Sequence, residues 1–385
     1  MSRTRVMLVD DSPAVRQIVA EAIAGEPSLE LVAQAGNGAI ALQRLAMYRP
    51  DLIALDVDMP VMNGLVFLRE LQRHASRPHV IMFSSYTREG ARVTLEALDA
   101  GAADFVTKPA GTLGRAAALQ QVRDELLPRI RAIMSGVPPA PHDAPAGPIV
   151  AEPPPMLSRS ALERARARDQ AAPENRQPAH PTGSRSQRPR TEAPTVQVVA
   201  IAASTGGPPA VKQVLDALPA DFPVPVVIVQ HMPALFTGPF AERLDATCAL
   251  EVREAQAGER LVRGQVRVAP GDFHMEITNR MTHRVELHQS PLVNGVRPSA
   301  DILLHSLARN HGTGVLAVVL TGMGHDALSG CEAVHAAGGQ VLVQDRRTSV
   351  VWGMPRAIEE AGLADDVLPL GGIAQAIVER VQVGR

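Results

Sequence analysis

The chain has 385 residues, of which 45% are hydrophobic and 20% charged, and its formal net charge is -2 at pH 7. This length exceeds one ordinary domain, so we expect two or three folded units. The near balance of charge gives no overall cationic field, which argues against binding of nucleic acid or a membrane surface by bulk charge. Two cysteines, Cys248 and Cys331, are too few for a disulfide framework.

The N-terminal sequence does not read as a targeting segment. Met1-Ser2-Arg3-Thr4-Arg5 leads straight into a short apolar run and two aspartates, so no signal-peptide apolar region develops. No other apolar stretch approaches the roughly 20 residues that a membrane span needs. We therefore expect a soluble, cytoplasmic protein without membrane insertion.

Residues 1–133 alternate short apolar runs with segments of helical spacing. In the last such segment Leu119, Val122, Leu126, Ile130 and Ile133 recur at steps of three and four. Strands that alternate with helices indicate right-handed crossovers and a doubly wound parallel sheet. The predicted strands are 6–9, 29–32, 52–55, 80–83 and 105–106, and helical spacing also marks 14–23 and 65–71.

Composition changes sharply in residues 134–194. This stretch of 61 residues holds 13 of the chain's 32 prolines and no aromatic residue. It buries too little apolar surface to offset the entropy of ordering it, so we predict a long flexible linker. A transient helix at 157–167 is compatible with the composition, and a poorly ordered third domain is the alternative.

Residues 195–385 repeat the alternation of the first region. Apolar runs at 196–202, 224–229, 315–320 and 340–343 read as strands covered on both faces. Helical spacing follows at 208–218, 327–337 and 355–361, while 262–287 shows short alternating strands and turns. We predict a second α/β domain with a doubly wound parallel sheet and a small antiparallel hairpin.

Polar residues follow the predicted strands of the first region where each strand ends. These are Asp10-Asp11, Asp56, Ser84-Ser85 and Thr107-Lys108-Pro109. The carboxyl ends of parallel strands meet at one edge of a sheet, so these side chains should gather there. Clustered carboxylates repel one another unless a hard cation lies among them, and Mg²⁺ suits oxygen ligands. A helix cap or turn is the usual role of a single such Asp, but the set favours a phosphoryl site.

This array resembles the receiver domain of response regulators, whose fold is flavodoxin-like. The resemblance implies that Asp56 is the phosphoacceptor. It also implies that Asp11, Asp56 and the backbone carbonyl of Asp58 hold Mg²⁺, with Asp10 supporting them.

The same resemblance implies roles for the residues on the neighbouring strands. Ser84 and Lys108 would contact the phosphoryl oxygens, and Phe105 would be the aromatic side chain that changes rotamer on activation. The peptide bond between Lys108 and Pro109 is commonly cis in this family. Lys108 is one of only two lysines, beside Lys212, and a compact ammonium group suits a phosphoryl contact.

In the second region a strand is followed by the small-residue turn Ala203-Ser204-Thr205-Gly206-Gly207. Such a turn can present a hydroxyl beside free backbone amides at a helix start, which suits nucleophilic attack and oxyanion stabilisation. It also suits an N-cap or a phosphate cradle.

His231 and Asp326 favour catalysis over an N-cap or a phosphate cradle, because each follows another predicted strand of the same sheet. Serine, histidine and carboxylate are the inventory for acyl transfer, in which histidine takes the serine proton and aspartate orients the histidine. The chain order Ser, His, Asp differs from that of α/β-hydrolases, so their fold should not be inferred.

The pattern resembles the catalytic domain of the chemotaxis protein-glutamate methylesterases. The matching motifs are Ala203-Ser204-Thr205-Gly206-Gly207, Gln230-His231-Met232-Pro233, Ala269-Pro270-Gly271-Asp272, Arg297-Pro298-Ser299 and Leu320-Thr321-Gly322-Met323-Gly324. The resemblance implies Ser204 as nucleophile, His231 as general base and Asp326 as its orienter. It also implies Thr205 and Met323 as backbone oxyanion donors, and a second activity that deamidates receptor glutamines.

The sequence departs from this family near the catalytic residues. Ala202 stands where glycine is frequent, and His325-Asp326-Ala327 replaces Asn-Asp-Gly. Alanine does not adopt positive φ cheaply, so the loop that carries Asp326 should shift if that geometry is required. His325 is also a rival base beside the orienter.

A receiver followed by this domain implies an enzyme that is activated by phosphorylation and gives sensory adaptation. A chemotaxis histidine kinase would phosphorylate Asp56 and relieve blockage of the Ser204 site. The substrates would be methyl-accepting chemotaxis receptors, and the ester chemistry would need no cofactor.

The alternative is a non-catalytic response regulator whose output domain binds nucleic acid or a nucleotide. The second region shows no helix-turn-helix pattern, no Walker lysine spacing and no Gly-x-Gly-x-x-Gly, all of which weighs against it.

Overall fold

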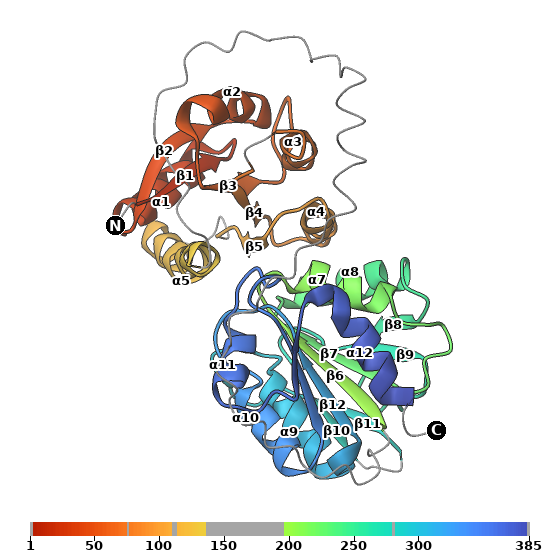
Figure 1. Ribbon diagram of the computed structural model, residues 1–385. Coiled ribbons are helices and arrows are strands. Elements are labelled where there is room, and N and C mark those ends of the chain that lie inside the picture. The colour runs from red at the N-terminus through yellow and green to blue at the C-terminus, as the bar shows by residue number, and fades with distance from the viewer. Residues whose placement is uncertain (1–2, 75–76, 110–113, 136–195, 279–281, 383–385) are drawn as a thin grey trace, which may run out of the picture. The chain divides into compact units, whose positions relative to one another are not determined.

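The computed structural model describes residues 3–74, 77–109, 114–135, 196–278 and 282–382, which are coloured in Figure 1. Almost all of the predicted linker 134–194, including the helix considered at 157–167, lies outside these residues. Among the helices that are described, none combines the length and apolar character of a membrane span.

The first region folds around five parallel strands in the order β2-β1-β3-β4-β5. The chain moves to one side of β1 and then to the other, which confirms the predicted doubly wound sheet. All five predicted strands are present. They are β1 (Thr4–Val9), β2 (Leu29–Ala35), β3 (Leu52–Asp56), β4 (His79–Ser84) and β5 (Asp104–Thr107).

Helices cover both faces of this sheet (Figure 1). Val6 and Leu8 of β1 point into the core formed with α1 and α5, while Met7 and Val9 point into the core formed with α2, α3 and α4. This alternation follows from the two-residue period of a strand. The helices are α1 (Pro13–Ala24), α2 (Gly38–Tyr48), α3 (Gly64–Leu71), α4 (Arg88–Asp99) and α5 (Arg115–Met134).

The second region contains a seven-stranded parallel sheet in the order β14-β13-β12-β6-β7-β9-β8. Strand β6 lies between β12 and β7, so the chain order reverses beside β6. A reversal of this kind opens a crevice at the carboxyl ends of the strands. The strands are β6 (Val198–Ala203), β7 (Val226–Gln230), β8 (Glu251–Glu254), β9 (Gln265–Val268), β12 (Val315–Val319), β13 (Gln340–Gln344) and β14 (Asp366–Leu368).

Two apolar layers sandwich the second sheet. Val199 and Ile201 of β6 pack with α7, α8 and α12, whereas Val198 and Ala200 pack with α9, α10, α11 and the hairpin β10-β11. These elements are α7 (Gly207–Asp216), α8 (Ala234–Asp245), β10 (His274–Thr278), β11 (Arg284–His288), α9 (Ala300–His311), the 3₁₀ helix η1 (Gly312–Gly314), α10 (Leu328–Ala336), α11 (Met354–Glu360) and α12 (Leu370–Gln382).

The antiparallel hairpin predicted within 262–287 is present as β10 and β11. The first strand of that segment, β9, instead pairs in parallel with β7 and β8 and extends the main sheet. The one cis peptide bond among the described residues joins Arg297 to Pro298, so the expected cis bond between Lys108 and Pro109 is wrong.

Candidate functional site

Ser204 lies directly after β6, in the turn that leads into α7. The backbone of the turn reaches φ 76° at Gly206, a conformation that favours glycine. A Cβ at Gly206 would also lie 2.5 Å from the Cβ atom of Val350. Both constraints require glycine at position 206, two residues after Ser204.

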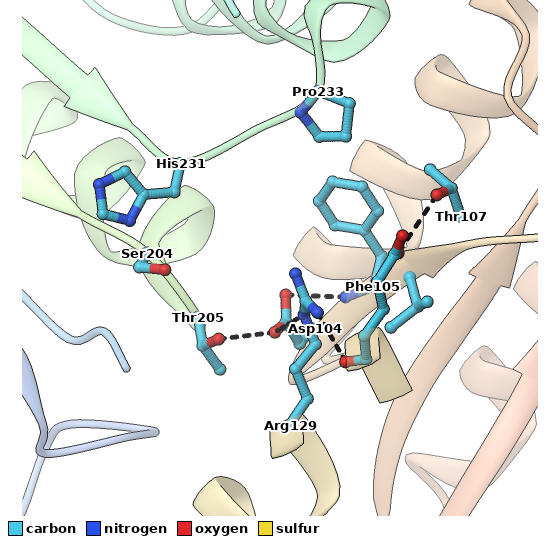
Figure 2. Close-up of a pocket in the computed structure, with 10 residues that line it drawn as sticks. Asp104, Phe105, Thr107, Arg129, Ser204, Thr205, His231 and Pro233 are labelled. Carbon is cyan, nitrogen blue, oxygen red and sulfur yellow. Dashed lines mark hydrogen bonds and ion pairs between the residues drawn. The ribbon is translucent and has the colours of Figure 1, made fainter. Parts of the chain in front are cut away.

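His231 follows β7, and its ring is paired with the carboxylate of Asp326 from the loop after β12. The distance from His231 Nε2 to Asp326 Oδ2 is 2.8 Å. An Nε2–H that donates to Asp326 leaves Nδ1 of the ring as the acceptor. Ser204 and His231 line one pocket, and Figure 2 draws them next to each other on its wall. The predicted serine, histidine and aspartate thus come from three adjacent strands.

The carboxylate of Asp326 is buried and bound by donors at the start of α9. Oδ1 accepts from Ser299 Oγ at 2.7 Å and Asn294 Nδ2 at 3.0 Å, and Oδ2 accepts from Ala300 N at 2.6 Å. Burial by itself would raise the pKa of Asp326, but its hydrogen bond with His231, the charge of His231 and these donors lower the pKa below its ordinary value. Asp326 therefore stays ionised and can hold the His231 ring.

Ala327, one of the departures from the family pattern, directly follows Asp326. Ala327 is fully buried and adopts φ 81°, so alanine takes the left-handed conformation that glycine would take more cheaply. Asp326 still reaches His231 at 2.8 Å. Alanine at position 327 thus does not prevent the contact between Asp326 and His231, and this pairing favours His231 over the neighbouring His325 as the base.

Two loops bring the predicted oxyanion donors Thr205 and Met323 to the same edge. The loops are tied together, because Ser204 N donates to Thr321 O at 3.1 Å and Thr321 Oγ1 donates to Thr205 O at 2.9 Å. Within the described part of the chain, the backbone N–H groups of Thr205 and Met323 have no hydrogen-bond acceptor. Both therefore remain available to a developing oxyanion.

In the first region, carboxylate oxygens of Asp10, Asp11 and Asp56 lie within 4.8 Å of one another. Lys108 Nζ lies 2.9 Å from Asp10 Oδ2 and 2.7 Å from Asp56 Oδ2. The Asp58 backbone N–H donates to Asp56 Oδ1 at 3.2 Å. Three carboxylates and one ammonium leave a net negative charge, and this donor set fits a hard divalent cation.

The environment of Asp56 disfavours its charged form. Burial raises the pKa of Asp56 to about 6, against the hydrogen bond and charge of Lys108 and together with repulsion from Asp10. Burial lowers the pKa of Lys108, but the carboxylates of Asp10 and Asp56 more than compensate and raise it. The lysine therefore stays charged.

Ser84 ends β4, and Phe105 is the second residue of β5. Ser84 is fully buried, and its Oγ donates to Gly90 O at 3.2 Å and accepts from Thr94 Oγ1 at 2.7 Å. The Phe105 ring stacks on Phe236 of α8, with centroids 4.5 Å apart and an interplanar angle of 20°. Phe105 is thus a direct contact between the two regions, which belong to one compact unit.

The pocket beside Ser204 is closed on one side by residues of the first region, as Figure 2 shows. Thr205 Oγ1 donates to Asp104 Oδ2 at 2.7 Å, and Arg129 Nε lies 3.3 Å from the same carboxylate oxygen. Burial raises the pKa of Asp104, although the charge of Arg129 and the Thr205 hydrogen bond oppose the rise. The first region therefore contacts the nucleophile turn itself.

Sequence reasoning did not identify Asn294, Ser299 or Asp104 as parts of the site. Asn294-Gly295 is a two-residue hairpin turn with φ 55° and 78°, and this dipeptide is a known turn signal. The signal predicts the turn but not that its amide reaches Asp326. The contact of Asp104 with Thr205 has no sequence signal.

The chain is similar to solved domains and to full-length proteins. The CheB methylesterase catalytic domain of Thermotoga maritima is 41% identical over 48% of this chain and 98% of its own, with a TM-score of 0.47. The response regulator domain of Thermotoga maritima CheB is 39% identical over 36% of this chain and 99% of its own, with a TM-score of 0.32. Residues 199–377 match the family described as CheB methylesterase, and residues 6–117 match the response regulator receiver domain.

Full-length relatives carry one shared description, protein-glutamate methylesterase/protein-glutamine glutaminase. A relative from Nocardioides sp. is 41% identical and covers 99% of this chain and 96% of its own length. A relative from Pseudomonas aeruginosa, whose name carries the number 2, is 40% identical and covers 97% of this chain and 96% of its own length. These relatives support a hydrolase with a receiver domain and not the non-catalytic alternative.

Proposed function

Because the chain belongs to the protein-glutamate methylesterase/protein-glutamine glutaminase family, we propose that it removes methyl esters from glutamate residues of methyl-accepting chemotaxis receptors and releases methanol. Deamidation of receptor glutamines is proposed as its second activity. The observation that carries the proposal is the His231–Asp326 pair at 2.8 Å, whose histidine lines one pocket with Ser204. Two free thiols, Cys248 and Cys331, are compatible with action in the cytoplasm.

The geometry supports a two-step acyl transfer. Nδ1 of His231 takes the proton from Ser204 Oγ, which attacks the ester carbonyl of the substrate. Asp326 keeps the ring oriented and balances the imidazolium charge. The N–H groups of Thr205 and Met323 bind the oxyanion. His231 gives this proton to the leaving methoxide, which departs as methanol. Water then gives a proton to His231 and attacks the acyl carbon; the bond from that carbon to Ser204 Oγ breaks, the glutamate carboxylate is released, and His231 returns the proton to Ser204 Oγ.

We propose that residues 1–133 act as the phosphorylated switch, 134–194 as the linker and 195–385 as the hydrolase. A chemotaxis histidine kinase would transfer its phosphoryl group to Asp56. Asp11, Asp56 and the carbonyl oxygen of Asp58 would hold Mg²⁺, with Asp10 supporting them. When bound, the ion neutralises charge on the phosphoryl oxygens. Lys108 supplies a second positive charge, and Ser84 would move its hydroxyl toward the phosphoryl group.

Regulation is proposed to act through the contacts that close the pocket. Asp104 holds the side chain of Thr205, and Phe105 stacks on Phe236 near His231. A rotamer change at Phe105 after phosphorylation would remove that stacking and open the path to Ser204. The linker would keep the released receiver at high effective concentration, because closure entropy grows only logarithmically with length.

Release of radiolabelled methanol from membranes that carry methylated receptors tests this proposal. The full chain should release methanol slowly alone and faster with a small phosphodonor and Mg²⁺. Asp56→Asn should keep the slow rate and lose the stimulation. Methanol release by the wild type that never exceeds the rate without protein would refute the proposed activity.

A further inference from the structure

Gln230 is a buried polar residue to which the reaction above gives no role. It ends β7, immediately before His231, and only 1% of its surface is exposed. Its side-chain Nε2 donates to Ser204 O at 2.9 Å and to His231 O at 3.4 Å. Two carbonyl acceptors require the NH₂ end of the amide, so they settle its orientation. One side chain therefore links the nucleophile turn to the base.

The carbonyl that Gln230 binds belongs to the same peptide unit as an oxyanion donor. Ser204 C=O and Thr205 N–H share one planar peptide, in which the two bonds point in opposite directions. Fixing the carbonyl therefore also fixes the direction of the N–H bond. A hydrogen bond to the carbonyl further polarises the peptide and makes its N–H a stronger donor.

The local packing is built around this contact. Ser204 O also accepts from Gly207 N at 2.8 Å, so two donors hold the carbonyl. A Cβ at position 207 would lie 2.0 Å from Gln230 Oε1, so glycine is needed there for the amide to fit. Within the described residues, Gln230 Oε1 is buried without a hydrogen-bond donor. An unpaired buried acceptor lowers stability, so stability alone does not explain a glutamine here.

We propose that Gln230 is a positioning residue of the oxyanion hole, which it serves by fixing the Ser204–Thr205 peptide. The inference rests on the proposed role of Thr205 N–H in the esterase reaction. The Gln230 contact stabilises the transition state, in which the oxyanion exists, more than the bound substrate. Its loss should therefore lower kcat and leave KM unchanged.

The test compares Gln230→Met with the wild type, using the phosphodonor-activated full chain and methylated receptor membranes. Methionine keeps the length of the glutamine side chain but lacks its amide oxygen and its NH₂ group. We expect kcat to fall about 10- to 100-fold, below the loss for deleting a whole oxyanion donor. KM and the pH midpoint of kcat should not change, because His231 and Asp326 keep their pairing. The Tm should stay within about 4 °C of the wild type.

Gln197→Met is the matched control, because Gln197 lies at the opposite end of β6 and should keep wild-type kcat. If Gln230→Met does not fold, Gln230→Asn takes its place: its amide is one methylene short of the carbonyl, so kcat should fall in the same way. Wild-type kcat in the folded variant, a change in KM alone or a shifted pH midpoint would overturn the inference.

Ser204→Ala in the same assay distinguishes failure of the role inferred for Gln230 from failure of the proposed esterase reaction. If Ser204→Ala is inactive and Gln230→Met matches the wild type, only the inference about Gln230 fails. If Ser204→Ala keeps wild-type activity, the proposed nucleophile fails, and the role of Gln230 fails with it.

Discussion

Asp326 shows how one residue is prepared by its surroundings. Its carboxylate lies among the Ser299 hydroxyl, the Asn294 amide and the first N–H groups of α9, and it faces the ring of His231. These donors favour the ionised form, which burial would otherwise disfavour. The proposed orienter is thus charged and held by hydrogen bonds before substrate binds.

Asp326→Asn should lower kcat by about 10³- to 10⁴-fold, because an amide does not balance the imidazolium and favours the wrong ring tautomer. Methanol release by the activated full chain measures the loss. Asp272→Asn is the control, since Asp272 also lies in a loop of the second region but pairs with Arg297. Equal kcat in Asp326→Asn and Asp272→Asn would mean that Asp326 does not orient the base.

Ala327→Gly should stabilise the protein by about 0.5–1 kcal/mol. Alanine at φ 81° carries the steric cost of the left-handed region, and glycine removes more strain than it adds in unfolded-state entropy. Urea denaturation measures the difference. The control Ala333→Gly lies within α10, where glycine should destabilise by about 1 kcal/mol. Equal losses of stability in Ala327→Gly and Ala333→Gly would show that Ala327 is not strained.

At the level of elements, sequence patterns predicted the sheets well. Strand β6 is buried along its whole length, and such strands appear as continuous apolar runs. The rule that polar groups gather beyond the carboxyl ends then placed Ser204, His231 and Asp326 at one edge. The patterns did not predict that β9 joins the main sheet, because a four-residue strand can pair in parallel or antiparallel fashion with the same sequence.

The rest of the site depends on contacts that no local pattern encodes. Asn294 and Ser299 reach Asp326 only because the hairpin turn and the start of α9 fold over the loop after β12. The positive φ of Ala327 contradicts local preference and is imposed by its buried surroundings. Gln230 belongs to the motif Gln230-His231-Met232-Pro233, but no local pattern indicates its hydrogen bond to Ser204 O.

The carboxylates at the ends of β1 and β3 should bind Mg²⁺ with an affinity that depends on pH. The pKa of Asp56 is raised to about 6, so below pH 6 protons compete with the cation for this carboxylate. Affinity should therefore be full near pH 7.5 and fall up to about tenfold per pH unit below 6. Calorimetric titration at pH 7.5, 6 and 5 measures it. Asp56→Asn should bind more weakly and show a flatter pH profile; an equally steep profile in that variant would contradict the assignment.

At the scale of the whole molecule, the first region lies against the proposed catalytic centre. Asp104 bonds to Thr205, Phe105 stacks on Phe236, and Arg243 Nε lies 2.7 Å from Asp99 Oδ2. We propose that contacts of this kind exclude a large protein substrate from Ser204. The surface that carries these contacts would then both inhibit the enzyme and transmit the phosphorylation state of Asp56.

Deletion of residues 1–133 should raise methanol release above that of the unphosphorylated full chain, because it removes Asp104 and Phe105 from the pocket. The comparison uses equal concentrations and no phosphodonor. Asp104→Ala in the full chain should raise the rate less, since the Phe105 contact remains. An unchanged or lower rate after the deletion would count against inhibition by the first region.

The most direct measurement of the central claim is labelling by a fluorophosphonate, which reacts with an activated serine hydroxyl. Incubation of the phosphodonor-activated chain, digestion and mass spectrometry locate the modified residue. We expect a single adduct on Ser204, which is lost in Ser204→Ala and forms at least 100-fold more slowly in His231→Ala. Labelling of a different residue, or undiminished labelling of Ser204→Ala, would contradict it.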